Sequence, residues 1–448
     1  MQIHFIAIGG SAMHNLALAL KNKGDKVTGS DDEIFNPSKS RLKSAGLLPE
    51  KFGWFPTKIH EGLDAIILGM HAREDNSELL KAQSLGLNIY SYPEYLFEQS
   101  KDKIRIVIGG SHGKTTITSM ILHVLKMVSI DCDYMVGAQL EGFDTMVKIT
   151  DAPIIVLEGD EYLSSPIDLR PKFHLYKPHI ALLSGIAWDH INVFPSFEFY
   201  LKQFEIFIDK IESGGYLTYC SDDESLNIIS STNPEIETEP YQLPEFTIED
   251  GKTFLHFRKE KIELEIFGAH NLLNMMGALN ICRKLGVEES KFFEAIYSFK
   301  GASHRLEKIA HREGLIVYKD FAHSPSKVQA TVKAICQQYE ESKIIAVLEL
   351  HTFSSLSHDF LSEYKNSMNG PDISYVYYNP KTLIHKNISD FCEELVFDSF
   401  QRKDLLVYTD NHLCFSSVQS ELSLKTVVLF MSSGDFGGLN LEDFSQNL

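Results

Sequence analysis

The feature that most constrains the fold is a repeated order of apolar strand, glycine turn and helix-like apolar pattern. It first occurs as His4–Ile8, the turn Gly9–Ala12 and the stretch Met13–Leu20, and it returns after the short strand Ile104–Ile108. A third segment, from about Gly301, again alternates strands with helical patterns. Strands that alternate with helices form parallel sheets through right-handed crossovers. The sequence therefore predicts an α/β protein built on parallel sheets.

The chain has 448 residues, which is too long for one ordinary core. At about 150 residues per domain, three domains are expected. We place them at residues 1–102, 103–300 and 301–448, with the polar stretch Glu98–Lys103 as the first linker. The central domain also contains an alternating stretch, Leu255–Phe267, which follows an Asp250-Gly251 turn signal and predicts a small β hairpin region.

Composition excludes several classes of protein. With 42 basic and 61 acidic residues the net charge is −19, which argues against nucleic-acid binding through a basic surface. No apolar run approaches the roughly 18 residues that span a bilayer, and the N-terminus has no basic lead-in typical of a signal peptide. Six scattered cysteines are typical of reduced thiols. We expect a cytoplasmic protein with no nucleic-acid or membrane partner.

The second glycine turn has the composition of a phosphate-binding loop. It reads Gly110-Ser111-His112-Gly113-Lys114-Thr115-Thr116, between a predicted strand and a helix. Glycines allow backbone N–H groups to face an anion, lysine reaches the outer phosphates, and a threonine hydroxyl can ligate Mg²⁺. The loop is shorter than the full P-loop pattern, and an ordinary glycine-rich turn is the alternative. The pattern favours ATP or GTP binding.

Acidic and histidine residues follow the next two buried strands. The strand Pro153–Leu157 leads into Glu158-Gly159-Asp160-Glu161, and Trp188-Asp189-His190 follows the strand His179–Leu183. The carboxyl ends of parallel strands meet at one edge of a sheet, so these residues are expected near Lys114, where they could ligate Mg²⁺. The alternative is an acidic loop and a hydrogen-bonded histidine.

The first glycine turn is a weaker signal. Gly9 and Gly10 follow a strand, and Asp31 ends the next one, but the dinucleotide fingerprint has alanine at positions 7 and 12. An NAD site, another nucleotide site and a purely structural turn all remain open. His71 and Arg73 follow the predicted strand Ala65–Leu68 and could line the same pocket or be surface charge.

With these motifs, the whole chain resembles the Mur ligase family of ATP-dependent amide-forming enzymes. Gly110–Thr116 resembles the family's G-T-x-G-K-T-T loop, and Gly268–Asn274 resembles G-x-H-N-x-x-N. His304–Glu307 resembles H-R-x-E, and Asp320–Pro325 resembles D-Y-A-H-x-P. Gly185 stands where the family usually has an asparagine. Each motif is short, but with Glu158 and Asp189-His190 they occur in the family's order.

The resemblance implies a Rossmann-like N-terminal domain that holds a UDP-sugar, a central P-loop ATPase domain, and a Rossmann-like C-terminal domain that brings the amine. It implies ATP and Mg²⁺, with Lys114, Glu158 and His190 catalytic and Thr115, Glu158 and His190 as metal ligands. Further implied ATP contacts are Asn271, Asn274, Arg305 and Asp320. The expected UDP-sugar residues are Gly9, Gly10, Ser11, Ala12, Met13, Asp31, His71 and Arg73.

Within the family, two branches that use UDP-N-acetylmuramate resemble this chain. We expect the branch that joins it to the tripeptide L-alanyl-γ-D-glutamyl-meso-diaminopimelate in peptidoglycan recycling, with the branch that uses free L-alanine as the alternative. The forms of Leu157–Tyr162 and Ser432–Gly438 favour the tripeptide, as does the lack of arginine in His351–Ser355, where the alanine branch has H-R-Y-T-R. A nucleotide-dependent switch and an NAD oxidoreductase are the competing classes.

Overall fold

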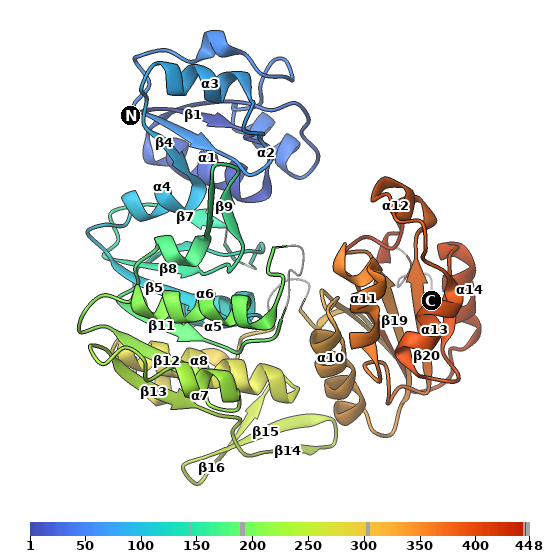
Figure 1. Cartoon of the computed structure of the whole chain (residues 1–448). Helices are drawn as coiled ribbons and strands as arrows, with labels where there is room; N and C mark the ends of the chain where they lie inside the picture. The colour runs from blue at the N-terminus through green and yellow to red at the C-terminus, as the bar shows by residue number, and fades with distance from the viewer. Residues whose placement is uncertain (141, 144, 189–192, 302–304, 442–443, 445–448) are drawn as a thin grey trace. The chain divides into compact units, whose positions relative to one another are not determined.

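The structure is a computed structural model that describes residues 1–140, 142–143, 145–188, 193–301, 305–441 and 444 (Figure 1). The chain forms two compact units. The first contains Met1–Ile186, Ser196–Tyr241 and Gly277–Phe292, and the second contains the remaining described residues. The division of the chain into three domains at 102 and 300 stays a prediction.

The first unit begins with a four-stranded parallel sheet in the order β2-β1-β3-β4. Apolar residues of β1 and β3 are fully buried, which places the core on the central strands. The first strand ends two residues earlier than predicted, because Ala7 takes a positive φ of 68° and turns the chain out of the sheet. The strands are β1 Gln2–Ile6, β2 Lys26–Ser30, β3 Ala65–Leu68 and β4 Ile89–Ser91. The helices are α1 Ser11–Lys23, α2 Ser38–Ser44, α3 Ser77–Ser84 and α4 Tyr92–Glu98, with a short 3₁₀ turn at Pro56–Lys58.

The larger sheet of this unit has seven strands in the order β13-β12-β11-β5-β8-β6-β7, and only the β6–β7 pairing is antiparallel. The predicted strands at 104–108, 153–157 and 179–183 are its central members. Its strands are β5 Ile104–Gly109, β6 Asp133–Met135, β7 Val147–Lys148, β8 Ile154–Glu158, β11 Ile180–Leu183, β12 Tyr216–Cys220 and β13 Glu237–Tyr241. Helices α5 Lys114–Met127, α6 Phe197–Asp209 and α7 Glu224–Ile229, a 3₁₀ turn at Lys172–Leu175 and the small hairpin of β9 Leu163–Ser165 and β10 Asp168–Pro171 complete this part.

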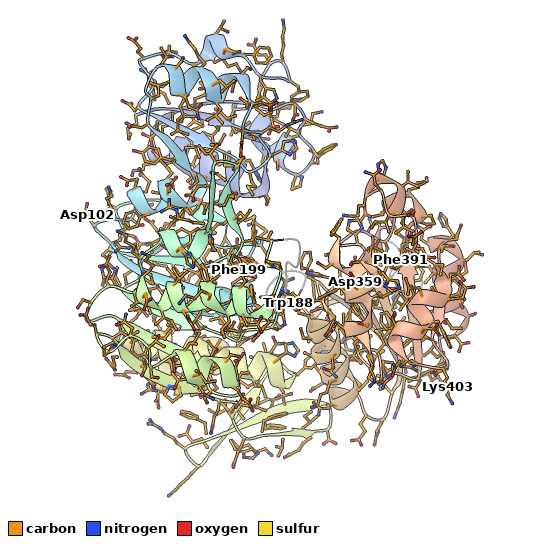
Figure 2. All side chains as sticks on the ribbon, viewed as in Figure 1. Asp102, Trp188, Phe199, Asp359, Phe391 and Lys403 are labelled. Carbon is orange, nitrogen blue, oxygen red and sulfur yellow. The ribbon has the colours of Figure 1, made fainter. Side chains whose placement is uncertain are left out.

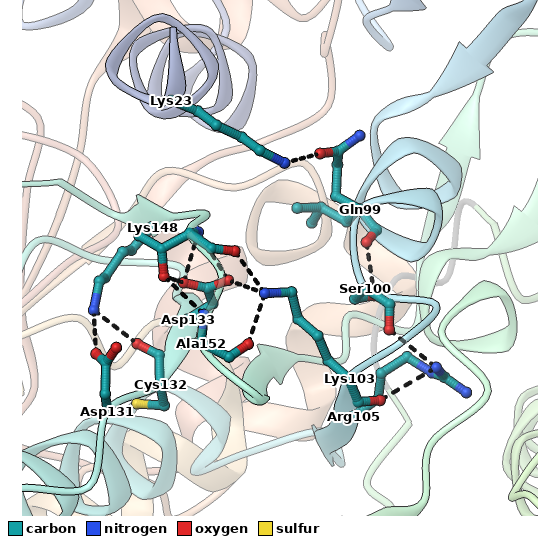
Figure 3. A network of polar contacts seen from close by, with 12 residues as sticks. Lys23, Gln99, Ser100, Lys103, Arg105, Asp131, Cys132, Asp133, Lys148 and Ala152 are labelled. Atoms are coloured by element: carbon teal, nitrogen blue, oxygen red, sulfur yellow. Dashed lines mark hydrogen bonds and ion pairs between the residues drawn. The ribbon is translucent and has the colours of Figure 1, made fainter.

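Two basic residues fix the linker to the seven-stranded sheet (Figure 3). The Lys103 ammonium donates to Asp133 at 2.8 Å and to the carbonyls of Thr150 and Ala152 at 2.7 Å each. The buried Arg105 guanidinium donates to the Ser100 carbonyl at 3.1 Å. Because these hydrogen bonds join residues 100–105 to the segment 133–152, the linker is an ordered part of this unit. Asp102 lies exposed at its end (Figure 2).

The second unit contains a three-stranded antiparallel meander where we predicted a hairpin. Asp250 and Gly251 both have positive φ, and their turn joins β14 Phe246–Glu249 to β15 Lys252–Phe257. A second turn at Arg258 and Lys259 leads to β16 Glu260–Leu264. The helices α8, Ala269–Lys284, and α9, Glu289–Ile296, follow, and each has residues in both units.

The sheet of residues 307–431 has six strands in the order β17-β18-β22-β19-β20-β21. The predicted alternation of strands and helices after Gly301 corresponds to its parallel part, the strands β18–β22. The strand β17 is an antiparallel edge strand that we did not predict because its sequence, EKIAHR, is mostly polar. Two layers of buried apolar side chains cover its faces. Its strands are β17 Glu307–Arg312, β18 Leu315–Asp320, β19 Lys343–Leu350, β20 Ile373–Tyr378, β21 Leu406–Tyr408 and β22 Thr426–Met431. Its helices are α10 Pro325–Gln338, α11 His358–Leu361, α12 Pro380–His385, α13 Glu393–Phe400 and α14 Asn411–Ser420, with 3₁₀ turns at Ser354–Leu356 and Ser362–Tyr364.

Among the described residues, no helix combines the length and the apolar character needed to cross a membrane.

Candidate functional site

The phosphate-type loop lies between β5 and the start of α5, as its sequence predicts. Gly110 has a φ of +123° and Gly113 a φ of +79°, conformations that favour glycine. A Cβ atom at Gly110 would also overlap the Ser184 side chain at the end of β11. The loop is tied to that strand end, because the Ser111 N–H donates to the Gly185 carbonyl at 2.9 Å. These constraints leave the N-terminus of α5 facing the carboxyl edge of the sheet.

Lys114 is held inside the site by Glu161, an acid of the segment after β8 that was not among the predicted site residues. Its ammonium lies 2.6 Å from the Glu161 carboxylate and donates to the Gly110 carbonyl at 2.7 Å. Burial lowers the pKa of Lys114, but the charges of Glu161 and Asp160 raise it more, so the net pKa is raised and the lysine is charged. The sequence does place Glu161 three residues after Glu158, which was the available signal.

Thr115 and Glu158 meet beside this lysine. The Thr115 hydroxyl donates to one Glu158 carboxylate oxygen at 2.7 Å, and the Gly137 N–H donates to the other at 2.6 Å. Glu158 is 4% exposed, and burial together with the charge of Asp160 raises its pKa despite the Thr115 hydrogen bond. A hydroxyl and a carboxylate side by side form an oxygen donor set of the kind that Mg²⁺ prefers. The pair therefore fits the predicted metal site, and its role as ligand stays a prediction.

Asp189, His190 and His304 lie outside the described residues, so the structure does not place the predicted histidine ligand. Trp188, the residue before Asp189, is 41% exposed (Figure 2). Its indole N–H donates to the Phe194 carbonyl at 3.0 Å.

The N-terminal glycine turn is hydrogen-bonded to the carboxylate of Asp31. The Gly9 N–H donates to the Asp31 carboxylate at 2.6 Å, with Gly10 as N-cap and α1 beginning at Ser11. Burial, the largest cause, and a hydrogen bond with Asp32 raise the pKa of Asp31. Ligand atoms of Asp31, Asp32 and His71 lie within 4.8 Å of one another. The sequence prediction included Asp31 and His71 and missed Asp32.

The remaining predicted residues of the N-terminal turn and pocket differ in exposure. Met13 is 5% exposed and belongs to the core beneath the turn, while Ala12 is partly exposed. The Arg73 side chain is 85% exposed and lies 3.4 Å from Asp75, and that of His71 is 65% exposed and lies 3.2 Å from Asp32. The geometry of Arg73 is that of a surface ion pair.

The predicted ATP residues of the second unit lie at element ends. At the start of α8, the Asn271 side-chain amide donates to the Phe267 carbonyl at 3.0 Å. Asn274, about one helical turn further along α8, has a relative exposure of 8%. The Arg305 guanidinium lies 4.7 Å from the centre of the Phe321 ring. Asp320, at the end of β18, accepts N–H groups of Leu306 at 2.6 Å and Ala322 at 2.7 Å, so it fixes the neighbouring backbone.

Comparison with known proteins identifies the family. Models of three parts of the Mur ligases match along the chain: the family's catalytic domain at residues 2–103, its middle domain at 108–282 and its glutamate ligase domain at 304–434. A UDP-N-acetylmuramate–L-alanine ligase of Caldicellulosiruptor bescii is 33% identical over 81% of this chain and 80% of its own length. The enzyme of the same name from Clostridium kluyveri is 30% identical over 82% and 81%.

Solved structures agree in fold. The UDP-N-acetylmuramate–alanine ligase of Thermotoga maritima has a TM-score of 0.75 at 20% identity, covering 100% of this chain and 98% of that one. A murein peptide ligase of Psychrobacter arcticus has a TM-score of 0.67 at 21% identity, with the same coverage. A MurF ligase of Thermotoga maritima, solved in complex with ADP, has a TM-score of 0.64 at 18% identity and covers 89% of this chain and 96% of that one. The chain belongs to the Mur ligase family and is an ATP-dependent ligase that forms carbon–nitrogen bonds in the peptidoglycan pathway.

Proposed function

We propose that this enzyme joins the carboxylate of UDP-N-acetylmuramate to the amino group of L-alanine, with ATP converted to ADP and phosphate. The observation that carries the choice of amine is the similarity to relatives named UDP-N-acetylmuramate–L-alanine ligases, at 30–33% identity over about four fifths of the chain. This reverses the preference of the sequence motifs, which favoured the tripeptide.

The reaction needs an activated carboxylate, because an amine does not attack a carboxylate anion at neutral pH. Phosphorylation by ATP gives an acyl phosphate, the amine attacks its carbonyl carbon, and phosphate leaves. Lys114 would neutralise charge that develops on the transferred phosphoryl group. To do so its ammonium must exchange the Glu161 carboxylate, now 2.6 Å away, for a phosphate oxygen.

A Mg²⁺ ion would supply further charge neutralisation at the phosphates when bound. Thr115 and Glu158 would hold it, since their oxygens already lie 2.7 Å apart in a buried site. His190 is proposed as a further ligand on the resemblance alone.

We assign the UDP-sugar to the N-terminal turn, residues 9–13, with Asp31. The Asp31 carboxylate already accepts the Gly9 N–H and would repel a pyrophosphate at that position. It suits a donor instead, such as a ribose hydroxyl or the N–H of uracil. His71 is a further candidate because it lies in the cluster with Asp31.

The tripeptide is the second candidate. His351–Ser355 contains no arginine, and a solved ligase for this tripeptide from Neisseria meningitides is 25% identical over 67% of this chain. Because the tripeptide begins with L-alanine, both amines would form the same bond. They differ only in whether the alanine carboxyl is free or bonded to glutamate.

A direct competition decides between them. Purified enzyme, ATP, Mg²⁺ and UDP-N-acetylmuramate are incubated with equal concentrations of L-alanine and the tripeptide, and the products are quantified by mass spectrometry. We expect the L-alanine product to dominate. A dominant tripeptide product would overturn the choice of amine and leave the ligase chemistry intact, and the absence of any amide product would overturn the proposal.

A further inference from the structure

A buried carboxylate at the carboxyl edge of the six-stranded sheet has no role in the chemistry described so far. Glu349 lies near the end of β19 and Ser432 directly follows β22. The two strands are parallel neighbours, with Leu348 paired to Met431, so Glu349 and Ser432 are the next pair in register. Ligands of open α/β sheets bind outside this edge.

Glu349 closes the loop Ser432–Gly438. One carboxylate oxygen, Oε2, accepts both the Ser432 hydroxyl and the Phe436 N–H, the latter at 2.9 Å. The Gly434 N–H in turn donates to the Ser432 hydroxyl at 2.7 Å. Glu349 is therefore the acceptor on which the turn of the loop depends.

The burial of Glu349 makes this arrangement costly unless its hydrogen bonds are kept. It is 1% exposed, and among the described residues the basic side chain within 4.0 Å of it is the His351 imidazole, whose Nδ1 lies 3.8 Å from the other oxygen, Oε1. Burial raises the pKa of Glu349, and the two loop hydrogen bonds act against that rise. A buried carboxylate at such a position is stabilised chiefly by the loop that it holds.

The loop backbone has little freedom around this contact. A Cβ atom at Gly434 would lie 2.8 Å from both Glu349 Oε2 and the His351 ring. Phe436, Gly437 and Gly438 all have positive φ, at 51°, 71° and 88°. The Phe436 side chain is buried in the aromatic cluster with Phe415 and Phe430, so the loop is fixed on both sides while Gly437 and Gly438 remain exposed.

We propose that Glu349 is a positioning residue for the amine substrate: it holds the loop Ser432–Gly438 in the conformation that receives the amine at this edge of the sheet. The inference rests on the proposed function and on the expectation from the family resemblance that the C-terminal part of the chain brings the amine. Glu349 acts through the loop, as a hydrogen-bond acceptor, and its charge does not contact the substrate.

The distinction can be tested because both loop hydrogen bonds go to the same oxygen. In Glu349→Gln the amide oxygen can replace Oε2 and accept both donors, while the charge is lost. In Glu349→Ala the acceptor itself is lost, and in Ser432→Ala the link to Gly434 is lost. Ser417→Ala is the control, since it removes a hydroxyl of the same sheet region that bonds to Tyr408 at 3.1 Å and Tyr375 at 3.4 Å rather than to a loop residue.

Steady-state kinetics of the full-length enzyme are measured for the amine, UDP-N-acetylmuramate and ATP. We expect Glu349→Ala to raise the KM for the amine about tenfold, the effect of one or two lost buried hydrogen bonds, with the other two KM values unchanged. Ser432→Ala should shift it in the same direction, Glu349→Gln should restore it to within about threefold, and Ser417→Ala should leave it unchanged. An equal defect in Glu349→Gln and Glu349→Ala would overturn the proposal, because charge would then be the requirement.

Hydrogen exchange keeps this test separate from the proposed function. Exchange of the Gly434 and Phe436 amides should accelerate in Glu349→Ala and Ser432→Ala and stay at the wild-type rate in Glu349→Gln. Should Glu349→Ala not fold, Ser432→Ala and Glu349→Gln give the same comparison. Unchanged exchange in Ser432→Ala would overturn the positioning role, whereas a wild-type enzyme without ligase activity would overturn the proposed function alone.

Discussion

Two glycine turns in the first unit share a backbone plan and differ in charge. Both follow a parallel strand and lead into a helix, α1 at Ser11 and α5 at Lys114. At the first turn a carboxylate, Asp31, accepts the Gly9 N–H. At the second turn a lysine and a hydroxyl enter the site, and the nearby carboxylates Glu161 and Glu158 bind those side chains. The shared strand–turn–helix backbone thus places both turns at a sheet edge where a ligand can bind. The side chains, a carboxylate at the first turn and a lysine with a hydroxyl at the second, determine whether a triphosphate can bind there.

The largest effect is expected from removing the cation of the second turn. Lys114→Ala should leave a folded protein whose phosphoryl transfer falls by about 10²-fold or more, because the ammonium stabilises charge in the transition state. The matched control is Lys126→Ala at the other end of α5, whose exposed ammonium bonds to the Gly142 carbonyl. ADP formation is measured with both substrates present. Near-normal activity in Lys114→Ala would remove the contrast between the turns.

The carboxylate of the second turn should govern metal dependence. Glu158→Gln should raise the Mg²⁺ concentration for half-maximal activity by about tenfold or more, since a ligand oxygen loses its charge. Asp131→Asn, which changes an exposed acid paired with Lys148, serves as the control. Mg²⁺ titrations of both variants check this, and an unchanged half-maximal concentration in Glu158→Gln would argue against Glu158 as a ligand.

The carboxylate of the first turn, Asp31, should affect the binding of UDP-N-acetylmuramate. Asp31→Asn keeps an acceptor for the Gly9 N–H and loses the charge, so we expect the KM for UDP-N-acetylmuramate to rise about threefold to tenfold while that for ATP is unchanged. A rise in the KM for ATP instead would contradict the assignment of the two turns.

The same substitution, Asp31→Asn, weakens the expected substrate binding but should not lower the free energy of unfolding. The pKa of Asp31 is raised in the folded state, so the folded protein binds a proton more readily than the unfolded chain and gains stability as the pH falls through that pKa. Removing the charge of Asp31 by substitution at neutral pH should likewise stabilise the folded state. Urea unfolding at pH 7 should give Asp31→Asn a free energy of unfolding no lower than that of the wild type, and a clearly lower value would show that the charge stabilises the fold.

The smallest effect is expected at Arg73. Its side chain is 85% exposed and paired with Asp75, and exposed pairs contribute little. Arg73→Ala should leave the KM for UDP-N-acetylmuramate within about twofold of wild type, with an unchanged melting temperature. A rise of about tenfold would place Arg73 in the UDP-sugar pocket, as the sequence interpretation allowed.

Local pattern was enough to predict the central strands and the two turns. Apolar runs such as Ala65–Leu68 are strands because they are buried on both faces, and positive-φ glycines mark the phosphate-type loop. The polar edge strand β17 escaped prediction because an edge strand needs no apolar run. The contact of Glu349 with Phe436 depends on how distant strand ends come together, which neither periodicity nor spacing encodes. For the contact of Lys114 with Glu161, the spacing of Glu161 from Glu158 was the available signal.

The central claim is that the second turn uses ATP to activate a carboxylate for an amine. Its most direct test measures ADP release by the wild-type enzyme with UDP-N-acetylmuramate and amine supplied together, singly or not at all. ADP should form, one for each amide product, only when both substrates are present. Equal ADP release without them would show an unrelated ATPase and contradict the account.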